Sequence, residues 1–122
     1  MLTVLVVEDS LTEQKMITDC LQRAGFSVVQ CTSSEEAQKL LHSQQPNLMI
    51  LDVVLPGQSG FEFCRELKNN SATQAMPIII CSTKNTEADK LWGSMLGADA
   101  YLSKPLNLQE LVSTVQKLAI AV

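Results

Sequence analysis

The sequence predicts an α/β fold, a single doubly wound domain in which helices cover both faces of a parallel five-stranded sheet. Strand-like and helix-like segments alternate five times along the 122 residues. Three of the strand-like segments are short runs rich in valine and isoleucine that lack polar alternation, as is typical of parallel strands buried on both faces. Five successive βα units with right-handed crossovers place helices on both sides of the sheet.

The first half of the chain contains two strands and two helices. The apolar run Val4–Val7 is too short for a helix and is the first strand. Ser10–Glu13 has the capping-box pattern that begins a helix, and Gly25 is placed to end that helix. Phe26–Cys31 alternates apolar and polar residues, which favours an edge strand. Ser33–Glu36 then caps the second helix.

The middle of the chain repeats the pattern. Pro46 marks the end of the second helix, and the apolar run Leu48–Leu51 is the third strand. Phe61, Cys64 and Leu67 recur at the spacing of a short third helix. The fourth strand is the apolar run Ile78–Cys81.

The last elements follow the same alternation. Thr86–Glu87 begins a fourth helix, which contains Leu91, Trp92 and Met95, and Gly97 ends it. A fifth strand is expected next, followed by a helix striped with apolar residues. This strand is Ala100–Ser103, which Lys104–Pro105 breaks, and the stripe is Leu108, Leu111, Val112, Val115 and Leu118.

Composition excludes several classes of function. The chain is 46% hydrophobic but only 4% aromatic, so its core is aliphatic, and its net charge of −4 comes without any basic run. This argues against nucleic acid or an anionic membrane as the main partner. The four cysteines form no C-x-x-C pair, and no apolar run approaches the length of a membrane span. We expect no signal peptide, because Met1 leads directly into a short strand-like run. We expect a cytoplasmic protein of one domain, residues 1–122, with reduced thiols and no membrane insertion.

Polar residues follow the predicted strands at the carboxyl edge, where open α/β sheets bind ligands. The first strand runs into Glu8–Asp9, the third into Asp52, and the fourth into Ser82. If the first and third strands are neighbours, three carboxylates cluster there and need a cation to balance their repulsion. All-oxygen ligation suits Mg²⁺, whereas His42, the single histidine, lies mid-helix and far in sequence from these acids.

Two further residues suit phosphoryl chemistry. Ser82 supplies a hydroxyl, and Lys104, at the end of the fifth strand, supplies a fixed positive charge. Asp52 beside Mg²⁺ can act as a nucleophile toward phosphorus and form an aspartyl phosphate. The metal and the ammonium would then stabilise charge on the transferring group.

With these residues the chain resembles the response-regulator receiver domains of two-component signalling, the CheY-like proteins, over essentially its whole length. The matching positions are Glu8–Asp9, Asp52 with Leu55–Gly57 and Gly60, Ser82, and Lys104–Pro105. Their spacing also fits, with 30 positions from Asp52 to Ser82 and 22 from Ser82 to Lys104. The resemblance implies a flavodoxin-like (βα)5 fold with strand order 2-1-3-4-5.

The resemblance also implies a role for each site residue. Asp52 would be the phosphoacceptor, with Mg²⁺ held by Asp9, Asp52 and the backbone carbonyl of Val54, and Glu8 acting largely through water. Ser82 would hydrogen-bond the phosphoryl group and Lys104 would pair with it.

Two structural features follow from the same resemblance. The Lys104–Pro105 peptide bond would be cis, as X–Pro bonds permit. Tyr101 falls at the switch position, where an aromatic ring turns inward when Ser82 moves toward the phosphate. The alternative for Tyr101 is an ordinary aromatic residue on an edge strand.

A narrower resemblance, to small regulators of type IV pilus twitching motility and phototaxis, lies in four segments. They are Asp9–Glu13, Ser82–Lys84, Asp89–Gly93 and Gly97–Tyr101. Trp92, the one tryptophan, is either core filler or a partner anchor on the face formed by the fourth helix, fifth strand and fifth helix.

The function that the resemblance implies is that of a stand-alone response regulator, without an output domain and not an enzyme. A sensor histidine kinase would phosphorylate Asp52 with Mg²⁺, and the domain would catalyse its own phosphorylation and dephosphorylation. Ser82 and Tyr101 would reshape the face for a protein partner, in motility or taxis. The protein would be a monomer or weak dimer.

Other functions remain open. One is a phosphate sink or relay receiver, and another is a receiver-like module that never takes phosphate, against which the intact Asp9, Asp52, Ser82 and Lys104 argue. A small Asp-nucleophile phosphatase is disfavoured because Val54 stands where such enzymes commonly carry a second acid. A flavin site is weaker still, since no Ser/Thr/Gly phosphate loop follows the first strand.

Overall fold

Five parallel strands form one sheet in the order β2-β1-β3-β4-β5, which confirms the predicted topology. The computed structural model describes residues 2–120. Its strands are β1 (Thr3–Val7), β2 (Ser27–Cys31), β3 (Leu48–Leu51), β4 (Ile78–Ser82) and β5 (Ala100–Ser103). The edge position predicted for the alternating segment is also confirmed, because β2 pairs with β1 and its side chains are mostly half-buried.

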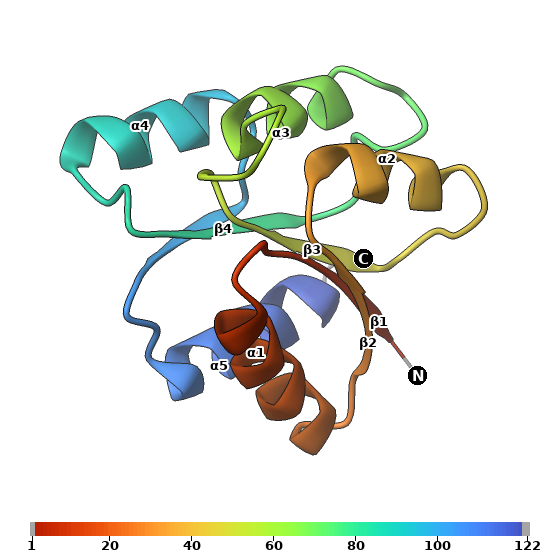
Figure 1. Ribbon diagram of the computed structural model, residues 1–122, viewed down its shortest axis with the longest axis vertical. Helices are drawn as coiled ribbons and strands as arrows, with labels where there is room; N and C mark the ends of the chain where they lie inside the picture. The colour runs from red at the N-terminus through yellow and green to blue at the C-terminus, as the bar shows by residue number, and fades with distance from the viewer. Residues whose placement is uncertain (1, 121–122) are drawn as a thin grey trace.

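In the part of the chain that the structure describes, five helices are present, and they cover the two faces of the sheet (Figure 1). They are α1 (Leu11–Arg23), α2 (Ser34–Leu41), α3 (Gly60–Lys68), α4 (Glu87–Met95) and α5 (Leu108–Ile120). Figure 1 shows α2, α3 and α4 on one face and α1 with α5 on the other. Within the described residues, no helix is long and apolar enough to cross a bilayer.

The alternation of side chains along each strand divides the core into two layers. Leu5, Met49 and Ile80 point toward the face covered by α2, α3 and α4 and belong to the same cluster as Phe63, and Ile80 lies beside Gly93 of α4. Their neighbours in the strands point the other way, toward α1 and α5. This second layer contains Val4, Val6, Ile50, Ile79, Ile17, Leu21, Leu111 and Val115. Each such side chain, buried fully, contributes about 1.5–3 kcal/mol through removal of apolar surface from water.

Side-chain caps hold the helix starts that the sequence predicts. Ser33 Oγ accepts a hydrogen bond from the N–H of Glu36 at 3.1 Å at the start of α2. At α4, Thr86 and Asp89 form a complete capping box, in which each side chain accepts from the backbone N–H of the other. These bonds satisfy N–H groups that have no partner within the helix.

The apolar residues of α4 do not enter the core. Leu91 and Met95 are 63% and 69% exposed, and Trp92 is 46% exposed. Gly93 is the buried residue of this helix, and it packs on the ring of Tyr101. The helix therefore rests on the sheet through its glycine, which leaves the larger apolar side chains on the outer surface.

Candidate functional site

The carboxyl ends of β1, β3 and β4 meet at one edge of the sheet. Val7 pairs with Leu51, and Leu51 pairs with Ile80, so the residues that follow these strands lie side by side. The backbone N–H of Asp52 donates to the carbonyl of Val7 at 3.1 Å, which ties the end of β3 to the end of β1. Register in the sheet thus brings segments 44 residues apart to one place.

Lys104 lies at the centre of this edge. Its Nζ donates to Asp52 Oδ2 at 3.1 Å, and it also pairs with carboxylate oxygens of Glu8 and Glu13. The backbone fixes its position, since the Lys104 N–H donates to the carbonyl of Ser82 at 3.1 Å. The peptide bond from Lys104 to Pro105 is cis, as predicted. One buried ammonium group therefore contacts three carboxylates.

Burial and charge act together on this cluster. Burial raises the pKa of the Glu8 carboxyl to about 7, although the hydrogen bond from Lys104 opposes the rise. Burial alone would lower the pKa of Lys104, but hydrogen bonds to Glu13 and Glu8, with the charge of Asp52, outweigh it and raise that pKa above its ordinary value. Lys104 is therefore a fixed positive charge at neutral pH.

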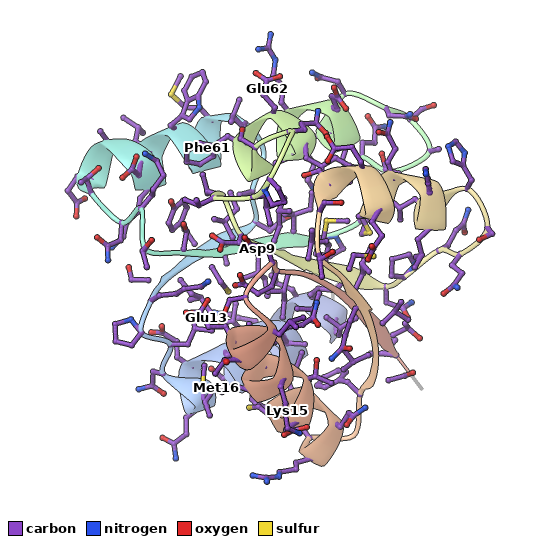
Figure 2. All side chains as sticks on the ribbon, viewed as in Figure 1. Asp9, Glu13, Lys15, Met16, Phe61 and Glu62 are labelled. Carbon is purple, nitrogen blue, oxygen red and sulfur yellow. The ribbon has the colours of Figure 1, made fainter. Side chains whose placement is uncertain are left out.

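The acidic residues fit a hard divalent cation. Among the described residues, Glu8, Glu13 and Asp52 each offer one carboxylate oxygen, and these oxygens lie within 4.8 Å of one another. An all-oxygen donor set of this kind suits Mg²⁺. Asp9, the predicted direct ligand, is exposed and lies outside this group, where β1 joins α1 (Figure 2). Its metal role stays a prediction.

The turn after Asp52 folds back tightly against the strand end. A Cβ built on Gly60 would lie only 2.0 Å from the carbonyl oxygen of Asp52, so only glycine fits there. The Gly60 N–H donates to the carbonyl of Val53 at 2.9 Å, and the Val54 N–H donates to Asp52 Oδ1 at 3.3 Å. This loop sets the position of both the Asp52 carboxylate and the backbone of Val54.

The start of α2 clamps the same loop from outside. Glu35 Oε2 accepts from the N–H of Gln58 at 2.9 Å, and Ser34 Oγ donates to the carbonyl of Gln58 at 3.1 Å. The hydrogen bond to Gln58 lowers the pKa of Glu35, which keeps that carboxylate ionised. The loop that follows Asp52 is therefore held by hydrogen bonds to the end of β3 on one side and to the start of α2 on the other.

Ser82 and Tyr101 are joined through one intervening residue. Ser82 is fully buried, and its Oγ accepts from the N–H of Lys84 at 3.2 Å. The Tyr101 hydroxyl donates to the carbonyl of the same Lys84, and burial raises the pKa of Tyr101 to about 12. Movement of Ser82 would therefore displace Lys84, whose carbonyl accepts the hydrogen bond from the Tyr101 hydroxyl.

Sequence reasoning missed Glu13 as a site residue. The pattern Ser10–Glu13 predicts a capping box, but only half of it forms: Ser10 Oγ accepts from the Glu13 N–H at 3.4 Å, while Glu8 Oε2 accepts from the Ser10 N–H at 3.2 Å. The Glu13 carboxylate goes to Lys104 instead. Its place on the first turn of α1, which starts at the sheet edge, is the signal that was available.

Gln14 is a second residue that sequence reasoning missed. Its side-chain amide is buried and donates to the carbonyl of Glu8 at 3.1 Å and to that of Cys31 at 2.9 Å. A glutamine on a helix gives no sequence signal for such a bridge. Gln14 ties the start of α1 to the ends of β1 and β2.

Comparison with known proteins gives consistent results. The family model described as response regulator receiver domain matches residues 4–116. Protein PilH of Pseudomonas aeruginosa is 36% identical over 115 residues, which cover 94% of this chain and 95% of PilH. The phosphate regulon transcriptional regulatory protein PhoB of the same organism is 35% identical over 93% of this chain, but the match spans only half of PhoB. The structure of chemotaxis response regulator CheY4 of Vibrio cholerae has a TM-score of 0.89 and 31% identity, and covers 97% of this chain and 98% of CheY4.

Proposed function

The chain belongs to the response regulator receiver domain family, and from that premise we propose that it accepts a phosphoryl group on Asp52 from a sensor histidine kinase. The observation that carries the proposal is the pairing of a buried aspartate with a buried lysine at the carboxyl edge of the sheet. Receiver domains are signalling domains, so we propose a switch and not an enzyme with a substrate of its own.

The proposed transfer uses the residues at this edge. A carboxylate oxygen of Asp52 attacks the phosphorus of a phosphohistidine, the P–N bond breaks, and its electron pair returns to the imidazole. Lys104, already 3.1 Å from Asp52 Oδ2, then pairs with a phosphoryl oxygen. Mg²⁺, held by Asp9, Asp52 and the Val54 carbonyl with Glu8 acting through water, would neutralise charge on the phosphoryl oxygens.

The proposed switch is the connection from Ser82 to Tyr101. A phosphoryl oxygen attracts the Ser82 hydroxyl, which breaks its bond with the Lys84 N–H and displaces the carbonyl that holds Tyr101. The ring of Tyr101 then turns inward, and the face formed by α4, β5 and α5 changes shape. Trp92 is exposed on α4, and we propose that it contacts a protein partner there.

We propose motility or taxis as the setting of this switch. The four segments that resemble regulators of type IV pilus motility support it, and so does the similarity to PilH along nearly the whole of both chains. The partner would be a protein of the motility machinery. A role as a phosphate sink or relay would use the same chemistry at Asp52.

Phosphorylation is tested by incubating the protein with acetyl phosphate and Mg²⁺ and measuring intact mass. We expect one added phosphoryl group, which disappears with Asp52→Asn or on removal of Mg²⁺ by a chelator. Asp19→Asn is the control, because Asp19 lies on α1 in an exposed ion pair with Lys15. A folded wild-type protein that takes up no phosphoryl group from acetyl phosphate or from a histidine kinase would contradict the proposal.

A further inference from the structure

We propose that Glu13 is a positioning residue of the phosphorylation site, which holds Lys104 in the resting protein and competes with the phosphoryl group for it. In the resting protein Glu13 holds the ammonium group, and it must release that group when Asp52 is phosphorylated. The inference rests on the proposed function. It adds a residue that controls how readily the site accepts a phosphoryl group.

The three carboxylates on Lys104 differ in burial. The side chains of Glu8 and Asp52 are 3% and 9% exposed, whereas that of Glu13 is 36% exposed. A charged group that separates from its partner but stays buried raises the free energy of the protein. A charged group that turns out into water recovers its hydration instead. Glu13 is therefore the carboxylate that can leave Lys104 at the lowest cost.

The structure also leaves space for this movement. A cavity of about 120 Å³ adjoins the ion pair and is lined by Glu13, Met16, Lys104, Pro105 and Leu106. Figure 2 shows Glu13 and Met16 on the same side of α1. The Glu13 side chain can therefore change direction without moving the helix.

The backbone that carries Glu13 is, by contrast, fixed. Ser10 Oγ accepts from the Glu13 N–H at 3.4 Å, and the side-chain amide of the next residue, Gln14, donates to the carbonyls of Glu8 and Cys31. The start of α1 is thus tied to the ends of two strands. Glu13 is held beside Lys104 by its backbone, while its carboxylate stays free to change partner.

The charge of Glu13 should slow phosphorylation of Asp52. Three carboxylates face one ammonium group, so the site carries excess negative charge where an anionic phosphoryl donor must enter. Glu8 and Asp52 have roles in the proposed phosphoryl transfer, whereas Glu13 has none in that transfer, although its carboxylate belongs to the same acidic group. Removing its charge should weaken the repulsion of the donor and free Lys104 for the phosphoryl oxygens.

The test compares wild type with Glu13→Gln at saturating Mg²⁺, with the rate of phosphorylation by acetyl phosphate followed by intact mass. We expect phosphorylation about fivefold faster, equivalent to about 1 kcal/mol. Calorimetry should show tighter binding of beryllofluoride, an analogue of the phosphoryl group, in the presence of Mg²⁺. Glu13→Asp, which keeps the charge, should stay close to wild type.

Glu62→Gln is a matched control. Glu62 occupies the same position on α3 that Glu13 has on α1, three residues after a capping serine whose Oγ accepts from its N–H. Figure 2 shows Glu62 on the outer side of α3, pointing away from the sheet. Any effect of the change on helix stability is therefore common to both variants, but only Glu13 contacts Lys104.

Two results would overturn the inference. A Glu13→Gln protein that is phosphorylated no faster than wild type refutes the competition. A large loss of Mg²⁺ affinity together with slower phosphorylation would instead make Glu13 a metal ligand. A wild-type protein that accepts no phosphoryl group at all refutes the proposed function, which is a separate outcome.

Discussion

The α-carbon of Gly60 faces the carbonyl oxygen of Asp52 so closely that a Cβ at position 60 would lie 2.0 Å from it. The contact is between two backbones, at the residue that starts α3 and at the residue that carries the proposed phosphoacceptor. Neither backbone can move independently, because the Gly60 N–H donates to the carbonyl of Val53. The absence of a side chain at Gly60 thus determines where the Asp52 loop lies.

Replacing Gly60 by alanine should therefore displace this loop. We expect Gly60→Ala to lower the free energy of unfolding by about 3 kcal/mol, since overpacking against backbone cannot be relieved by a rotamer change. Urea denaturation measures the loss. Ser94→Ala, on the exposed side of α4, is the control and should change stability by less than about 0.5 kcal/mol. A Gly60→Ala protein as stable as wild type would show that the close approach to Asp52 is not required.

Tyr101, the single tyrosine, should ionise at unusually high pH. Burial raises its pKa from 10 to about 12, so the folded protein favours the neutral phenol. The neutral phenol therefore contributes to the free energy of unfolding. This contribution is complete below pH 10 and is lost as the pH rises through about 12. Ultraviolet absorbance of phenolate, recorded against pH, measures the value directly. Unfolding in urea should return the midpoint to about 10, and a folded-state midpoint near 10 would contradict the burial of the ring.

Glu8 should make the metal-free protein less stable as the pH rises. Burial raises its pKa from 4.5 to about 7, so the folded state holds a proton that the unfolded state has lost. The stability from this group is therefore complete below pH 4.5 and disappears as the pH passes through about 7. Urea denaturation in the presence of a chelator should show wild type losing stability relative to Glu8→Gln across this range.

The control for Glu8 is Glu66→Gln, on the exposed side of α3, which should follow wild type at every pH. Adding Mg²⁺ should reverse the trend, because a cation favours the ionised carboxylate. Parallel pH profiles for wild type and Glu8→Gln would show that Glu8 is already ionised in the folded protein.

The sequence was sufficient for the sheet and for most of its carboxyl edge. Parallel strands end on the same side, so Glu8, Asp52 and Lys104 could be assigned to one edge from their places at strand ends. The strand order that makes them neighbours came from the family resemblance, and the structure places both carboxylates in contact with Lys104. The role of Glu13 could not be predicted, because the same carboxylate suits either a capping box or an ion pair, and only the packing of α1 on β1 decides between them.

The outer face of α4 shows a different limit of sequence reasoning. Leu91, Trp92 and Met95 have the spacing of a buried stripe, yet all three are exposed. Apolar periodicity predicts that one side of a helix is buried. It does not distinguish burial against the protein's own sheet from burial against a partner protein. The close contact of Gly93 with Tyr101 resolves this, because the side of α4 that faces the sheet contains the glycine.

Trp92 can serve as a fluorescence probe of this exposed face of α4. Trp92 is 46% exposed and is the one tryptophan of the chain, so acrylamide should quench its fluorescence readily in the resting protein. Leu91→Gln should change the free energy of unfolding by less than about 0.5 kcal/mol, because the side chain packs little. If the face changes shape on phosphorylation, beryllofluoride with Mg²⁺ should alter the quenching constant of wild type, and Asp52→Asn should abolish that change. A loss of stability of about 2 kcal/mol or more in Leu91→Gln would show that α4 packs through this face and that it is not free for a partner.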